Sequence, residues 1–339
     1  MAELKPTYGD FRLRGEVVWK NRDGAYREDV TASGYPFRSL RFGVKTDDNN
    51  IVEVDFFQTK FDNITLQNIE TRNRDKSVPY GEHHNLPDGY QLFMPTRLGI
   101  EKDENGKNLK KELIPYDAIK YVNEKLQNGD TVFIYGQSRF SEYTTRDGDV
   151  VQQTRFEPSG IYLSNTPYED DNFEGESIFK QEIILNRTEK NGSILDVHAY
   201  IVTNKDGAFI PYRFFIDIEK YKKFAMTMHK LKFGTVLKVE GYIHSTVKIE
   251  EIKEDDAWGE SPIKNTVPRV EKSLEITKAH KPSKKDIGKY SQKDFIPKEE
   301  KEENIDNPFQ AVEEEDAWGE SPSESHSNSF AYNYAHRFA

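Results

Sequence analysis

A short stretch near the middle of the chain combines residue types that bind phosphates and bases. Arg139, Phe140, Tyr143 and Arg146 lie close together, just before an Asp147-Gly148 pair. Arginine forms strong charged hydrogen bonds with phosphate, and aromatic rings stack on bases of any sequence. The combination predicts a surface that holds unpaired nucleic acid.

The flanking residues predict the elements that position this surface. An apolar run at residues 131–135 ends at Gly136, and a second strand is expected from residue 150 to 156. An Asp-Gly pair between two strand-like runs predicts a β-hairpin, and a glycine at a strand end indicates a bulge or tight bend. The four basic and aromatic residues should therefore lie on the arms of a hairpin.

The residues before this hairpin predict three strands and a helix. Strands are expected at 11–20, 36–45 and 51–57, and Pro115 begins a helix with apolar residues at helical spacing up to Leu126. Adding the hairpin gives the element order of an OB fold, a five-stranded Greek-key barrel. Residues 58–114 are polar and interrupted by prolines, so they are expected to form a long insertion with little regular structure.

A second copy of the same order follows. Strands are expected at 179–187, 194–202, 208–216, 235–242 and 246–252, with a helix at 218–231. Both copies place a glycine after the helix, at Gly129 and Gly234, and end the next strand with another, at Gly136 and Gly241. We therefore predict a mainly β protein with two OB-fold-like five-stranded barrels in tandem, each with one helix, at residues 1–168 and 177–252. Two unrelated small β domains are the alternative.

From residue 253 to 339 the composition changes. Large apolar residues become sparse, and 13 Lys and Arg stand against 19 Asp and Glu. Such composition is typical of disorder, so a disordered acidic tail is expected. The tail contains the same motif twice, EDDAWGESP at 254–262 and EEDAWGESP at 314–322. A solvated acidic run would explain either copy alone. Because tryptophan is a preferred interface anchor, the repetition instead predicts partner docking by Asp256, Trp258, Asp316 and Trp318.

The charge balance argues partly against nucleic acid. The formal net charge is -11, whereas nucleic-acid binders are usually basic. The tail carries -6 of this charge, which leaves residues 1–252 only mildly acidic at -5. Local basic grooves are therefore compatible with the composition.

The composition also indicates in which cellular compartment the protein is expected. No apolar run reaches membrane length, and the start lacks the pattern of a secretory signal. Cysteine is absent, which removes disulfides and thiolate chemistry. The expected location is cytoplasmic, in a bacterial cytosol or in the cytosol of a phage-infected host.

Chemistry of the catalytic kind is not indicated. The sequence has no GxxxxGK[ST] phosphate-binding motif and no nucleophile–base constellation, so neither an enzyme nor a cofactor is predicted. His83-His84 is the one histidine pair, beside Glu82 in the insertion. Loop histidines are more often plain solvent residues, so no metal site is predicted.

The predicted nucleic-acid site gathers basic and aromatic residues of the first barrel. Its members are Arg38, Arg41, Phe42, Phe57, Arg139, Phe140, Tyr143 and Arg146. Phe42 and Phe57 could instead fill the core. Weaker candidates in the second barrel are Tyr212, Arg213, Phe215, Tyr242 and His244.

The segment NGDTVFIYGQSRFSEYTTRDGD, at residues 128–149, resembles the fourth strand and hairpin of single-stranded DNA-binding proteins, especially those of bacteriophages. The likeness covers roughly residues 11–252, and the tail matches in character. It implies sequence-tolerant binding of unpaired strand in DNA replication, recombination or repair, with replication or recombination proteins recruited by the tail.

The chain departs from that family in its tail. Bacterial members usually end in a short acidic tip with an aromatic residue, whereas here the motif is internal and doubled, and the chain ends His-Arg-Phe-Ala. The alternative function is an OB-fold scaffold or inhibitor that binds proteins and no nucleic acid, which an acidic barrel face would favour.

Overall fold

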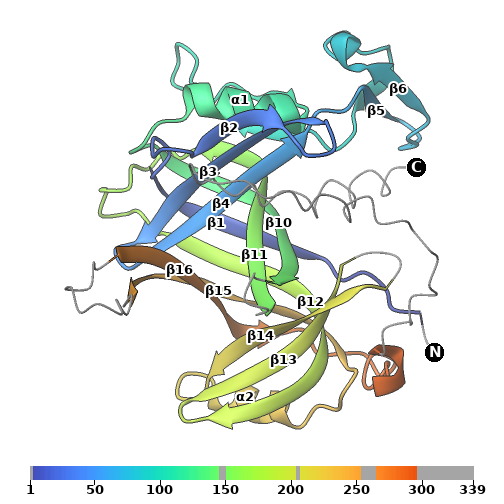
Figure 1. Cartoon of the computed structure of the whole chain (residues 1–339), viewed down its shortest axis with the longest axis vertical. Helices are drawn as coiled ribbons and strands as arrows, with labels where there is room; N and C mark the ends of the chain where they lie inside the picture. Colours follow the sequence, from blue (N-terminus) through green and yellow to red (C-terminus); the bar gives the residue numbers. More distant parts are fainter. Residues whose placement is uncertain (1–2, 145–149, 204–206, 253–264, 296–339) are drawn as a thin grey trace, which may run out of the picture.

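The computed structural model describes residues 3–144, 150–203, 207–252 and 265–295, and it is mainly β. Two groups of strands lie one above the other in Figure 1, with α1 against the upper group and α2 against the lower one. No helix in the described ranges is long and apolar enough to cross a membrane.

The upper group follows the predicted order. Its elements are β1 (Gly9–Val18), β2 (Tyr26–Val30), β3 (Pro36–Asp47), β4 (Asn50–Thr59), α1 (Pro115–Lys125), β10 (Thr131–Thr144) and β11 (Val150–Leu163). β1 forms because apolar residues alternate with polar ones, which buries Phe11 and Leu13 on one face. α1 starts at the proline and buries Ile119 and Val122 in the same core.

The lower group repeats this order. Its elements are β12 (Glu176–Asn191), β13 (Ile194–Val202), β14 (Phe209–Asp217), α2 (Lys222–His229), β15 (Val236–Ile252) and β16 (Asn265–Ala279). Pairings run β4-β3-β1-β10-β11 in the upper group and β14-β13-β12-β15-β16 in the lower one. β1 also pairs with β12, so one sheet continues through both groups.

A bulge at the same place in each group confirms the predicted role of the paired glycines. The register of β10 on β11 shifts between Tyr135 and Gly136, and that of β15 on β16 shifts between Glu240 and Gly241. A Cβ atom on Gly136 would lie 1.9 Å from a backbone oxygen of the neighbouring strand, and one on Gly241 1.7 Å away. Only glycine fits either position.

The predicted barrels need correction, because the strands are not closed into barrels. In the upper group β8 (Thr96–Gly99), from the insertion, pairs in parallel with β11 at Gly160–Tyr162. It takes the edge that β4 would need, and no β4–β11 pairing is found among the described residues. In the lower group, Phe215 and Glu275 are the one β14–β16 pair among the described residues.

The insertion is more regular than predicted. β5 (Asn63–Asn68), β6 (Lys76–Pro79) and β7 (Tyr90–Leu92) form a three-stranded sheet, with a single 3-10 turn, η1 (Tyr80–Glu82), after β6; β8 pairs with β9 (Lys111–Leu113). Leu66, Val78 and Leu92 pack with Tyr116 of α1 as a small separate core. Except for β5, these strands have three or four residues each, which is too short for alternation to reveal them reliably.

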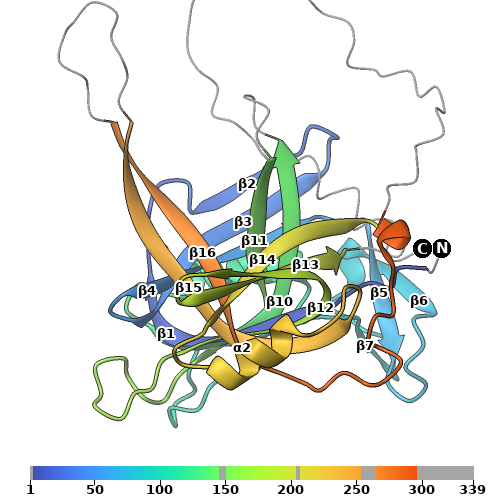
Figure 2. The same cartoon turned by 90° about the horizontal axis from the view of Figure 1, so that it is seen from below.

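The predicted tail also begins too early. The residues expected to form two strands, 235–242 and 246–252, belong to the single long strand β15, and the closing strand is β16 beyond them. The β15–β16 hairpin projects from the body in Figure 2. The chain then returns through η2 (Gln292–Phe295), where Tyr290 and Phe295 pack against Leu4 and Val202. Residues 265–295 are therefore not a disordered tail.

Candidate nucleic-acid interface

Two of the predicted site residues are core residues. Phe42 is fully buried, and the ring of Phe140 packs edge-on against Tyr212 with their centroids 4.8 Å apart. A ring inside the core offers no face to a base, so neither ring is placed to stack on one. Phe57 is half-buried beside Phe37, with the centroids 5.4 Å apart, and keeps some solvent exposure.

Arg38 has a structural role instead of the predicted binding role. Its guanidinium lies 2.9 Å from Glu28, 3.2 Å from Asp117 and 4.0 Å from the ring centre of Tyr116. These contacts join β2 and β3 to the start of α1. Because the side chain is only 11% exposed, it offers little to a ligand.

Two other predicted arginines of the first group, Arg41 and Arg139, belong to a charge cluster. The cluster consists of Arg22, Arg41, Arg139, Arg155 and Lys272 with Glu53, Asp55 and Glu157. Arg41 and Arg155 share Asp55, at 3.3 and 3.6 Å, and Arg139 pairs with Glu157 at 3.0 Å. Among the described residues, the cluster has five basic and three acidic side chains.

β16 contributes the lysine of this cluster. Lys272 donates a hydrogen bond to the carbonyl of Thr154, at 3.2 Å, and its ammonium lies 5.6 Å from the ring centre of Phe156. Burial lowers the pKa of Lys272 and raises the pKa of Glu157. The hairpin of the lower group thus reaches across the upper group at the cluster.

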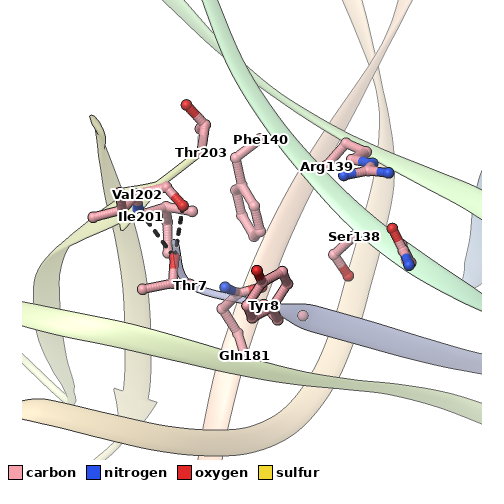
Figure 3. A pocket seen from close by; sticks show the side chains of 11 residues that line it. Thr7, Tyr8, Ser138, Arg139, Phe140, Gln181, Ile201, Val202 and Thr203 are labelled. Carbon is pink, nitrogen blue, oxygen red and sulfur yellow. Dashed lines mark hydrogen bonds between the residues drawn. The ribbon is translucent and has the colours of Figure 1, made fainter. Parts of the chain in front are cut away.

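A pocket adjoins the cluster where the two groups meet. Figure 3 shows Ser138 and Phe140 of β10 pointing toward Tyr8 and Gln181 across it, whereas Arg139 points away from them. The Ser138 hydroxyl and the Gln181 side-chain carbonyl are buried without a hydrogen-bond partner in the described part of the chain. Tyr8 is 63% exposed. The pocket therefore offers polar atoms and an accessible ring.

Two tyrosines missed by the sequence analysis, Tyr135 and Tyr162, lie side by side on one face of the upper sheet. A Cβ atom on Gly160 would lie 2.4 Å from the ring of Tyr135, and one on Gly99 2.5 Å from the ring of Tyr162. Each ring therefore covers a glycine backbone. The rings are inclined by only 14° with centroids 6.3 Å apart, and both are half-buried. We call this pair the tyrosine platform.

Burial and a hydrogen bond to Tyr135 raise the pKa of Tyr162 to about 12. Its hydroxyl therefore stays neutral over the physiological range. A neutral ring adds no negative charge that would repel a phosphate.

Arginines surround the tyrosine platform on the same sheet face. The register places Arg12 opposite Tyr135, Arg14 opposite Phe133, and Arg97 opposite Gly160. The side chains of Arg12 and Arg97 are 43% and 52% exposed, and each pairs with one carboxylate, on Glu176 and Glu112. Exposed ion pairs of this kind contribute about 0–1 kcal/mol, so a phosphate can compete for these arginines.

Most of the weaker candidates in the lower group already contact other side chains of the protein. Tyr212 is a core residue whose hydroxyl accepts a hydrogen bond from Thr154, and Arg213 pairs with Asp196 at 2.8 Å. His244 lies 2.7 Å from Glu275 and 5.9 Å from the ring of Phe215. Phe215 is half-buried. Tyr242 is 47% exposed. The side chain of Tyr143 and all of Arg146 lie outside the described residues, as do Asp256, Trp258, Asp316 and Trp318.

The chain was compared with known proteins. A single-stranded DNA-binding protein from Thermus aquaticus, solved as a deletion mutant, aligns with 10% identity and a TM-score of 0.39, covering 82% of this chain and 96% of the other. At that distance the likeness does not extend to function. No curated protein matches the sequence. The YorF family model matches residues 12–311, most of the chain, and the chain therefore belongs to the YorF family.

Proposed function

We propose that this protein binds single-stranded DNA without strong sequence preference and coats and protects unpaired strand during DNA replication, recombination or repair. The proposal rests on one observation: the tyrosine platform lies flat on the sheet with three arginines on the same face. Rings that lie flat can stack on any base, and arginines beside them can hold the connecting phosphates.

The electrostatics support the same function. Among the described residues, the charge cluster has more basic than acidic side chains, although the whole chain is acidic. A phosphate backbone that replaces its counterions with such cations binds less tightly as salt rises. We therefore expect affinity for oligo(dT) to fall steeply between low and physiological salt.

The test is fluorescence anisotropy with labelled oligo(dT) and the full chain. Tyr135→Ala with Tyr162→Ala should weaken binding, because a lost stacking contact costs on the order of 1–3 kcal/mol per base, which is roughly 5- to 150-fold in the dissociation constant. Tyr135→Phe with Tyr162→Phe keeps both rings and should retain the affinity.

Tyr35→Ala is the matched control. It removes a tyrosine that is 56% exposed and lies in the turn between β2 and β3. Affinity should be unchanged in this variant. If the platform double mutant binds oligo(dT) as tightly as this control does, the platform is not in the site, and preferential binding to duplex would contradict the function itself.

The finer fold assignment belongs to the same proposal. Each group of strands is proposed to be an OB-like unit, the first within residues 1–168 and the second beginning at residue 177 and extending beyond residue 252. The shared strand order and the shared bulge support this assignment, and OB folds are partly open by nature.

The repeated DAWGESP motif is proposed to recruit replication or recombination proteins. Its acidic residues should avoid the DNA, and its tryptophan should anchor in a partner pocket. Trp258→Ala with Trp318→Ala should therefore leave oligo(dT) affinity unchanged in the same assay. Pull-down of purified replication proteins should be lost, and retained pull-down would exclude the motif as the dock.

A further inference from the structure

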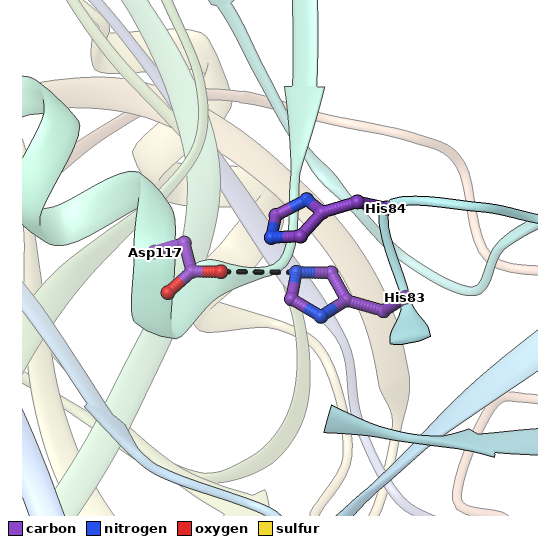
Figure 4. Close-up of side chains that lie close together, drawn as sticks. All are labelled: His83, His84 and Asp117. Atoms are coloured by element: carbon purple, nitrogen blue, oxygen red, sulfur yellow. Dashed lines mark hydrogen bonds and ion pairs between the residues drawn. The ribbon is translucent and has the colours of Figure 1, made fainter. Parts of the chain in front are cut away.

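Two histidines of the insertion meet an aspartate of the first helix. His83 and His84 follow η1, and Asp117 lies in the first turn of α1. One ligand atom from each lies within 4.8 Å of the other two. Figure 4 shows both imidazole rings turned toward the carboxylate. His83 is buried and His84 is exposed, so the group opens to solvent on one side.

The contacts of His83 point to a bound cation. Its Nδ1 atom contacts the carbonyl of Tyr80, and its Nε2 atom lies 3.0 Å from Oδ2 of Asp117. A neutral imidazole has one N–H group, so it can donate to only one of these two acceptors. If Nδ1 donates to the carbonyl, the Nε2 lone pair faces a carboxylate lone pair. A metal ion between them turns this repulsion into coordination.

The surroundings match those of known metal ligands. A metal-bound histidine usually donates its other ring N–H to a backbone carbonyl or carboxylate, which fixes the ring. Here the carbonyl of Tyr80 takes that position. Oδ1 of Asp117 accepts hydrogen bonds from the Tyr80 hydroxyl at 2.5 Å and from Arg38 at 3.2 Å. One carboxylate oxygen is therefore anchored, and the other is directed at His83.

The nearby arginine does not make the site cationic. Arg38 pairs with Glu28 at 2.9 Å as well as with Asp117. Two carboxylates thus offset one guanidinium before any metal ion binds.

We propose that His83, His84 and Asp117 bind one divalent first-row transition metal, with Zn²⁺ as the fitting ion, and that this ion fastens the insertion to α1. Two imidazoles and a carboxylate are ligand types that Zn²⁺ accepts in a four-coordinate site, with water as the fourth ligand. The proposal is independent of DNA binding, because none of the three residues belongs to the tyrosine platform or the charge cluster.

The test uses the full chain after removal of metals with a chelator. Co²⁺ should bind with one equivalent and give visible d–d absorption, and Zn²⁺ should displace it. His84→Ala removes an exposed ligand without disturbing the core and should lower Co²⁺ affinity by about tenfold or more. His229→Ala, which removes a histidine on α2, should bind Co²⁺ as the wild type does.

Hydrogen exchange tests the fastening role. Zn²⁺ should slow amide exchange in residues 76–92 and in α1 of the wild type, and should leave His84→Ala unchanged. A wild type that binds neither ion overturns the proposal, and so does full Co²⁺ affinity in His84→Ala. Binding without slower exchange overturns the fastening role.

Discussion

The two groups of strands have the same strand order and the same bulge, but the residue pair beside the bulge is different in each group. In the upper group Tyr135 lies opposite Gly160, and the ring covers the glycine. In the lower group the corresponding pair is Glu240 opposite Lys278. The same bulge therefore presents a flat ring in one group and an ion pair in the other.

In the lower group, the charged residues beside the bulge form ion pairs with one another. Glu240 lies 2.7 Å from Lys278, 3.5 Å from Lys180 and 3.3 Å from His280. A hydrogen bond from Lys278 is the main cause that lowers the pKa of Glu240 to about 2. The two groups thus differ in surface chemistry at the same backbone position, and the difference favours the upper group as the location of the proposed DNA site.

The largest expected effect is a loss of stability when the bulge glycine, which both groups share, is replaced. Gly136→Ala and Gly241→Ala each place a Cβ atom within 2 Å of a backbone oxygen, and backbone cannot move aside as a side chain can. Each change should destabilise the fold by about 1–3 kcal/mol or more. Chemical denaturation followed by circular dichroism measures the loss.

Gly81→Ala is the control for these two variants, since a Cβ atom there meets nothing within 4 Å. Its stability should equal that of the wild type. A loss of stability in only one of the two bulge variants would show that the bulges are not equivalent supports of the fold.

The second expected effect tests what separates the groups. Gly160→Ala places a Cβ atom 2.4 Å from the Tyr135 ring, and the ring can move, so the fold should persist while the platform is disrupted. Oligo(dT) affinity should fall by about 1 kcal/mol, the lower end for one stacked base. The matched variant in the lower group, Lys278→Ala, should leave the affinity nearly unchanged. Equal losses in both variants would assign DNA contacts to both groups.

The positions of most strands could be predicted from the sequence. Which face of each strand points toward the core could not. Successive residues of a strand point to opposite faces. Arg139 and Phe140, or Arg41 and Phe42, therefore cannot share one surface. Alternation alone does not say which face meets the core, and in both cases the arginine is outside and the ring inside.

Contacts between residues far apart in the sequence could not be predicted from the sequence. The tyrosine platform depends on Gly99, which is supplied by an insertion strand that pairs in parallel with β11. His83 and Asp117 are 34 positions apart and belong to different elements. β16 was missed because its few apolar residues stand between charged ones, which resembles the composition of a tail. A glycine opposite an outward tyrosine was the one local signal of the platform.

The smallest expected effect concerns the ion pairs of the lower group. The folded-state pKa of Glu240, about 2, lies below its ordinary value of 4.5. Its contribution to stability is therefore fully present above pH 4.5 and is lost as the pH falls toward 2. Because the group lies near the surface, the contribution should be about 1 kcal/mol or less.

Glu240→Gln should remove this contribution at neutral pH and flatten the acid dependence of unfolding between pH 4.5 and pH 2. Glu219→Gln, which removes an exposed carboxylate elsewhere in the lower group, should keep the wild-type slope. Thermal unfolding at a series of pH values compares the three proteins. An unchanged slope in Glu240→Gln would show that the lysines around it do not stabilise the lower group, and the contrast with the tyrosine platform would then lie in ligand binding alone.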